Sequence, residues 1–255
     1  MPVAADLYYH VYEGSEEGQR PPVVLIHGAG GTHLYWPSEI RRLPGYRVFA
    51  PDLPGHGKST GRGMQSITAY SRVILDWLGA VGVHRAVFVG HSMGSAIAIT
   101  LALDNAEHVL GLGLIGAGAR LRVAPELLEN AASPATFYSA VDTVVGWSFC
   151  SQTPEQLTEL AAQRMAETRP SVLHGDFLAC DAFDEMQRIG EIKQPTLVIC
   201  GADDKMTPAR YSQFLADNIP NAISKTIPNA GHMVMLEKPQ ATASALSDFL
   251  SGISY

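Results

Sequence analysis

The chain has 255 residues, 46% of them apolar and 17% charged, a balance that favours one globular domain with a substantial core. Its formal net charge of −7 argues against nucleic acid as a partner, because no basic stripe is present to neutralise phosphates. No uninterrupted apolar run is long enough to cross a bilayer, so no membrane span is expected.

The N-terminal sequence and the cysteines bear on location. The first residues lack a basic region followed by an apolar core, so no signal peptide is expected. Cys150, Cys180 and Cys200 are odd in number and stand in apolar or helical surroundings, which indicates buried free thiols. Such thiols are compatible with a reducing compartment, and we expect a cytoplasmic protein of unknown oligomeric state.

Short apolar runs alternate with helical patterns in the first half of the chain. The predicted strands cover residues 7–13, 23–26, 46–50, 86–90 and 110–115. The predicted helices cover residues 36–43, 67–81 and 93–105, with a polar turn at 14–22 and a run of turn formers at 51–59. This alternation predicts an α/β fold, with a mostly parallel sheet flanked by helices on both faces.

Residues 123–188 interrupt the pattern, because no buried strand is recognisable there. Prolines near acidic or polar residues mark about four helix starts, and the segment is rich in aromatic residues. The strand pattern resumes at 196–201 and 222–227, with helices at 208–218 and 237–249. We therefore predict a core of residues 1–122 and 189–255, with residues 123–188 as an inserted helical cap over the active face.

A serine stands where a strand meets a helix, in the pattern Gly90-His91-Ser92-Met93-Gly94. A strand that becomes a helix within about two residues passes through a crowded backbone conformation, and flanking glycines relieve the crowding. The hydroxyl of Ser92 is then exposed on a sharp turn, as a nucleophile requires. His91 should point away from this serine.

A serine nucleophile needs a base and a carboxylate that orients the base. Of the nine histidines, His232 fits best, because it follows the last predicted strand in a short glycine-containing loop. Asp203 and Asp204 are both candidates for the acid, since both follow the strand at 196–201. Ligands of parallel sheets bind beyond the carboxyl ends of the strands, where all these residues meet.

Over nearly its whole length the chain resembles the α/β-hydrolase superfamily, and more narrowly its small esterase-like members with a four-helix cap. The matching segments are residues 27–31 with Trp36, 50–59, 90–94, 201–208, and 231–232 with 237–239. The resemblance implies the α/β-hydrolase fold and selects Asp204 as the acid. It also implies an oxyanion hole made by the backbone N–H groups of Ala29 and Met93.

The implied reaction is two-step acyl transfer, in which Ser92 attacks an ester carbonyl and His232 carries the proton. No cofactor is expected, because no dinucleotide motif opens a helix near an early strand. No metal is expected either, since no residues show ligand spacing. The expected partner is a small-molecule ester.

Apolar side chains expected near the carboxyl ends of the strands suggest a pocket for a small to medium apolar acyl group. The candidate substrate-binding residues are Gly28, Leu34, Trp36, Phe137, Trp147, Met206 and Met233. Three alternatives to a carboxylesterase stay open: a lactone or carbon–carbon bond hydrolase, a ligand-binding signalling protein that retains the triad, and an inactive scaffold.

Overall fold

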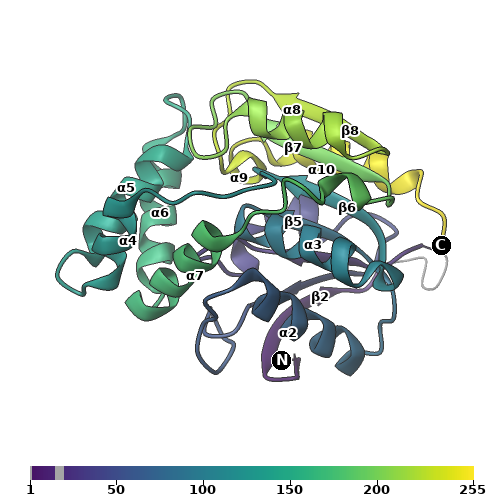
Figure 1. Ribbon diagram of the computed structural model, residues 1–255, viewed down its shortest axis with the longest axis horizontal. Coiled ribbons are helices and arrows are strands. Elements are labelled where there is room, and N and C mark those ends of the chain that lie inside the picture. Colours follow the sequence, from purple (N-terminus) through teal and green to yellow (C-terminus); the bar gives the residue numbers. More distant parts are fainter. Residues whose placement is uncertain (1, 15–19) are drawn as a thin grey trace.

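A computed structural model describes residues 2–14 and 20–255 of the chain (Figure 1). Its described part contains one eight-stranded sheet, in the order β1-β2-β4-β3-β5-β6-β7-β8. The strands are β1 (Val3–Ala4), β2 (Leu7–Tyr12), β3 (Val23–Ile26), β4 (Val48–Pro51), β5 (Ala86–His91), β6 (Val109–Ile115), β7 (Thr196–Gly201) and β8 (Ala222–Ile227). From β4 to β8 all pairs are parallel, whereas β2 runs antiparallel to both β1 and β4.

Helices cover both faces of the sheet, which explains why the central strands are buried at every position. Alternate strand residues point to opposite faces and join two separate apolar clusters. One cluster includes α2 (Ile67–Ala80), α3 (Met93–Asp104) and α8 (Ala209–Asn218). The other includes α1 (Ser38–Arg41), α9 (Val234–Glu237) and α10 (Pro239–Ser251). The predicted mostly parallel sheet flanked by helices is confirmed.

Four helices lie between β6 and β7 in the chain, and we call them the inserted helices. They are α4 (Pro125–Ala132), α5 (Phe137–Ser148), α6 (Glu155–Ala166) and α7 (Pro170–Ala182). In Figure 1, α4, α5 and α6 lie at the left end of the molecule, and α7 leads back toward α3. The inserted helices share a third apolar cluster of their own.

Several boundaries differ from those expected. Residues 36–43 form no continuous helix, because Pro37 and the extended backbone of Trp36 separate a short 3₁₀ turn, His33–Tyr35, from α1. The helix expected at 237–249 is divided into α9 and α10, since Pro239 starts a new helix after Lys238 leaves the helical conformation. Strand β1 is an addition to the expected set. Of the expected turn at 14–22, residues 15–19 lie outside the described residues.

Candidate active site

Ser92 lies at the sharp junction between β5 and α3. Its backbone is in a strained region, with φ at 52° and ψ at −116°, while Met93 already begins the helix. A side chain at Gly90 would meet the carbonyl of Gly94, and one at Gly94 would meet the carbonyl of Ile26. Only glycine fits at either position, so the glycine pattern around Ser92 is a requirement of close strand–helix packing.

Asp204 and His232 lie opposite each other at the ends of β7 and β8. The Nδ1 of His232 is 2.9 Å from Oδ2 of Asp204. The other oxygen, Oδ1, accepts the backbone N–H groups of Met206 and Thr207 at 2.9 and 2.8 Å. Asp203 is exposed and has no side-chain hydrogen bond to the described residues. Of the two aspartates, Asp204 therefore faces the histidine.

Thr207 is a further member of this group that the sequence reading did not identify. Its hydroxyl donates to Oδ2 of Asp204 at 2.9 Å and lies 3.2 Å from Nδ1 of His232. A threonine three residues after an aspartate, ahead of a proline and a helix, is a local turn signal that sequence reading can use. Burial raises the pKa of Asp204, but the facing His232 and the hydrogen bonds from Thr207 outweigh it and hold that pKa below its usual value.

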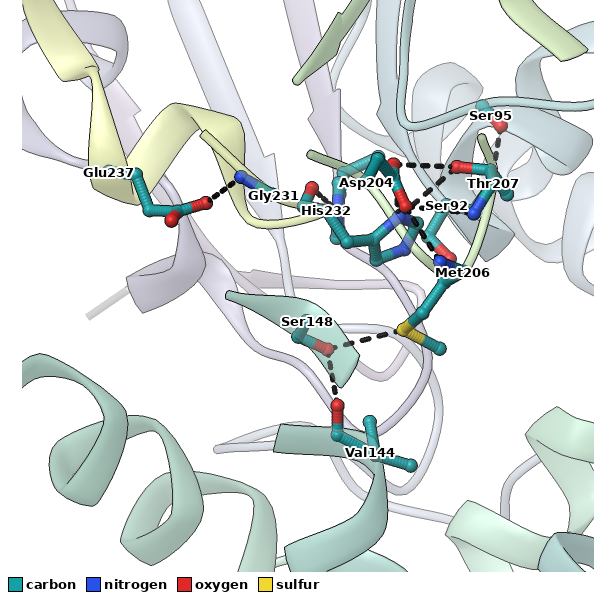
Figure 2. A network of polar contacts seen from close by, with 11 residues as sticks. Ser92, Ser95, Val144, Ser148, Asp204, Met206, Thr207, Gly231, His232 and Glu237 are labelled. Carbon is teal, nitrogen blue, oxygen red and sulfur yellow. Dashed lines mark hydrogen bonds and ion pairs between the residues drawn. The ribbon is translucent and has the colours of Figure 1, made fainter. Parts of the chain in front are cut away.

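The ring of His232 lies beside Ser92 (Figure 2). Figure 2 shows its ring between the carboxylate of Asp204 and the side chain of Ser92. The Nε2 of His232 is buried without a hydrogen-bond partner among the described residues. Ser92 and His232 line the same cavity. The histidine loop is itself held, because Oε2 of Glu237 accepts the N–H of Gly231 at 2.6 Å (Figure 2).

His91, expected to point away from Ser92, contributes to the lining of the site. It lines the same cavity, its ring centroid lies 4.8 Å from that of His232, and its Nε2 donates to the carbonyl of His232 at 3.1 Å. The reason is that His91 is the last residue of β5, and the carboxyl end of this strand meets the loop that carries His232. Burial and the nearby His232 lower the pKa of His91 to about 3, so this ring is neutral.

The loop after β3 brings Ala29 into the lining of the cavity. The carbonyl of Gly28 accepts Nδ1–H of His27 at 2.8 Å and the N–H of Gly31 at 3.1 Å. In a trans peptide the N–H points opposite to the carbonyl, so the N–H of Ala29 faces away from His27. Burial and the neighbouring His56 lower the pKa of His27 to about 4, which keeps its ring neutral.

Met93 would supply the second N–H. Its side chain is fully buried in the core, and its amide is at the N-terminus of α3, where the helix itself offers no acceptor. The structure thus brings one candidate donor from the β3 loop and one from α3 to the vicinity of Ser92.

The cavity at this site has a volume of about 250 Å³. Four of the residues predicted to bind substrate contribute to its lining: Gly28, Trp147, Met206 and Met233. The inserted helices contribute further apolar residues, which the sequence reading did not single out: Leu127, Val144, Met165 and Phe177. Met206 is held near the mouth by the hydroxyl of Ser148, 3.2 Å from its sulfur (Figure 2).

Three predicted pocket residues lie elsewhere. Trp36 is fully buried in the cluster on the face of the sheet covered by α1 and α10. Leu34 is 42% exposed on a 3₁₀ turn, and Phe137 is buried among the inserted helices. Aromatic and apolar character alone does not distinguish a pocket residue from a core residue, because both environments select the same side chains.

The described part of the chain carries neither a metal-ligand cluster nor a membrane-spanning helix. No group of three or more histidine, cysteine or acidic side chains there could hold a metal ion. None of the helices within residues 2–14 and 20–255 is both long and apolar enough to cross a membrane.

Comparisons with known proteins agree with this fold. The family model described as "alpha/beta hydrolase fold" matches residues 21–239. The chain is 28% identical to a 2-hydroxy-6-oxo-6-phenylhexa-2,4-dienoate hydrolase from Burkholderia cepacia, covering 93% of this chain and 90% of that protein. A solved thermophilic esterase is 35% identical with a TM-score of 0.81, covering 97% of this chain and 100% of that one.

The enol-lactonase from Burkholderia xenovorans LB400 is 25% identical with a TM-score of 0.88, and 96% of each chain is covered. These relatives act on different bonds but are all hydrolases by name. The family and its members therefore support hydrolase activity without selecting the bond that is cleaved. The chain belongs to the alpha/beta hydrolase family.

Proposed function

We propose that the protein is a serine hydrolase that cleaves carboxylic esters of small to medium apolar substrates. The observation that carries the proposal is the arrangement of Ser92 on its strained turn beside His232, which Asp204 orients at 2.9 Å. A neutral histidine whose Nδ1–H is held by a carboxylate presents the lone pair of Nε2 to a hydroxyl, as general-base catalysis requires.

The reaction would proceed in two acyl-transfer steps. Ser92 attacks the ester carbonyl while His232 takes its proton, and the N–H groups of Ala29 and Met93 stabilise the oxyanion. His232 then protonates the leaving alcohol and later activates water to release the acid. Loss of one oxyanion donor typically costs about 3 kcal/mol of barrier stabilisation.

The preference for apolar acyl groups rests on the cavity lining. Methionine and aromatic side chains of the inserted helices and of the β7 loop surround the space beside Ser92. We propose that residues 123–188 act as a cap over a core of residues 1–122 and 189–255, so that the cap determines which esters fit. The buried free thiols support a cytoplasmic location.

Ser92→Ala tests the assignment directly. We expect hydrolysis of p-nitrophenyl butyrate to fall by about 10⁴-fold or more, because the nucleophile is lost. The circular dichroism spectrum should be unchanged, and a fluorophosphonate probe should label only the wild-type protein. A Ser92→Ala variant that hydrolyses the ester at the wild-type rate would exclude this mechanism. Stable ligand binding without turnover by the wild-type protein would favour a signalling role instead.

A lactone hydrolase is the second candidate, favoured by the likeness to the enol-lactonase from Burkholderia xenovorans LB400. The cavity lining includes the cationic side chains of Arg122, which is paired with Asp184 at 3.5 Å, and Lys205. A lactone or ester that bears a carboxylate would be attracted to them. A panel of neutral and carboxylate-bearing esters and lactones, matched in length, separates the two candidates by the ratio of their kcat/KM values.

A further inference from the structure

A carboxylate is completely buried in α7, outside the Ser92–His232–Asp204 group. Asp176 is 0% exposed, and all its partners belong to the core rather than to the inserted helices. Its Oδ2 accepts the N–H of Gly30 at 2.9 Å and Nε2–H of His56 at 2.8 Å, and its Oδ1 accepts the hydroxyl of Tyr70 at 2.5 Å. A buried carboxylate is costly unless it is paired in this way, so the arrangement calls for a reason.

His56 supplies the charge that balances this carboxylate. Its Nδ1 lies 3.1 Å from the carbonyl of Pro54, and its Nε2 lies 2.8 Å from Asp176, so both ring nitrogens face acceptors. Only the doubly protonated ring can donate to both. Burial lowers the pKa of His56, but the charge and the hydrogen bond of Asp176 outweigh burial and raise that pKa above its ordinary value.

Gly30 connects this ion pair to the proposed oxyanion hole, because it follows Ala29 directly. Its N–H is held by Asp176, and its carbonyl accepts the hydroxyl of Thr168 at 3.0 Å. Thr168 lies between α6 and α7, so both contacts come from the inserted segment. In the peptide before Ala29, the carbonyl of Gly28 accepts Nδ1–H of His27, a residue of the core. The two peptide planes that flank Ala29 are therefore held from opposite sides.

We propose that Asp176, together with Thr168, is a positioning residue that sets the direction of the Ala29 N–H. This inference rests on the proposed function, in which that N–H stabilises the oxyanion. The inserted helices then do more than line the substrate cavity, since one of them orients catalytic backbone in the core. A purely structural role, in which Asp176 only attaches α7 to the core, predicts lower stability without a specific loss in the transition state.

Asp176→Ala separates these two roles. We expect kcat for p-nitrophenyl butyrate to fall by about 10- to 100-fold while KM changes little, because donor misplacement affects the transition state more than substrate binding. Affinity for a trifluoromethyl ketone, which forms a tetrahedral adduct with a serine, should weaken by the same factor as kcat/KM. Asp176→Asn should restore most of kcat, since its amide oxygen can still accept from Gly30 and His56.

Two further variants complete the design. His174→Ala is the matched control on the same helix, because His174 has no hydrogen bond within the described chain and is outside the cavity lining; it should leave kcat unchanged. Thr168→Val removes the nearer of two hydroxyls on the carbonyl of Gly30 and leaves that of Tyr35, 3.5 Å away; it should lower kcat a few-fold at constant KM. This variant decides the matter if Asp176→Ala does not fold.

The outcomes are distinguishable. A wild-type protein without Ser92-dependent hydrolysis contradicts the proposed function. An active wild-type protein whose Asp176→Ala and Thr168→Val variants keep kcat and trifluoromethyl ketone affinity contradicts the positioning role, even if their thermal stability falls. Amide hydrogen exchange at Gly30 needs no substrate: it should accelerate by at least ten-fold in Asp176→Ala and stay slow in His174→Ala. Unchanged exchange in Asp176→Ala would also overturn the inference.

Discussion

Two buried carboxylates hold opposite sides of the site, and they do so in different ways. Asp204 takes its hydrogen bonds from residues two and three positions along the chain and from His232, 28 positions away. Asp176 takes its bonds from residues 146, 120 and 106 positions away. The turn that carries Asp204, the proposed acid, is therefore a local construction, whereas the proposed oxyanion side is held through α7 of the inserted helices.

This difference explains what each side can tolerate. The turn after β7 brings the N–H groups of Met206 and Thr207 to Asp204 as soon as its own backbone is formed. Gly30 receives its support only when α7 is docked against the core. We expect disturbance of α7 to reach the proposed oxyanion loop, whereas the His232 loop is contacted by the inserted segment at a different place, where the carbonyl of Ser148 in α5 accepts the N–H of Met233 at 3.0 Å.

The largest effect is expected from Asp204→Asn. Because an amide can hold His232 in the wrong tautomer, kcat should fall by about 10³- to 10⁴-fold. Asp203→Asn is the matched control, since Asp203 is exposed and adjacent in sequence, and its kcat should equal that of the wild type. Steady-state kinetics on the two variants settle the comparison. Equal losses in both would place the acid role across the pair rather than on Asp204.

Thr207→Val should have a smaller effect on the same side. The hydroxyl is one of several donors to Asp204, so its loss should cost about 1 kcal/mol, or roughly 5- to 10-fold in kcat. Amide exchange at Gly30 should be unchanged, because Gly30 is held by Asp176 and Thr168 and, in the described part of the protein, has no hydrogen bond to the Asp204 turn. Altered exchange at Gly30 in this variant would show that the two sides are coupled rather than independent.

The smallest expected effect is the pH dependence of the unfolding free energy that comes from His56. Its folded-state pKa is raised above 6.5 by Asp176, with Asp52 adding to this effect and with the neutral His27 ring 5.0 Å away. A raised pKa means that the stabilisation is complete below the unfolded value and is lost as pH rises through the folded one. The difference in unfolding free energy between wild type and His56→Gln should thus be largest below the unfolded-state pKa and shrink as the pH rises through the raised folded-state pKa, as urea denaturation can measure. A constant difference would mean that His56 is not charged.

The sequence predicted the sheet because buried parallel strands are short, continuous apolar runs, as at Val23–Ile26. It predicted the Ser92 turn because glycine is required on both sides. Position after a strand predicted His232 and either Asp203 or Asp204, and the family resemblance selected Asp204. Thr207 could have been predicted as well, because its position after Asp204 is a local turn signal. Trp36 and Phe137 were misplaced in the pocket, because their apolar character suits the core equally well.

By itself, the sequence determined the elements whose signals are local: strand and helix periodicity, the glycines around Ser92, and the strand ends that carry the proposed acid and base. The tertiary structure alone decided which inserted residues line the cavity, that His91 turns toward His232, and that Asp176 reaches Gly30. The physical reason is that these contacts join segments far apart in the chain, and no local pattern of side chains encodes how such segments pack.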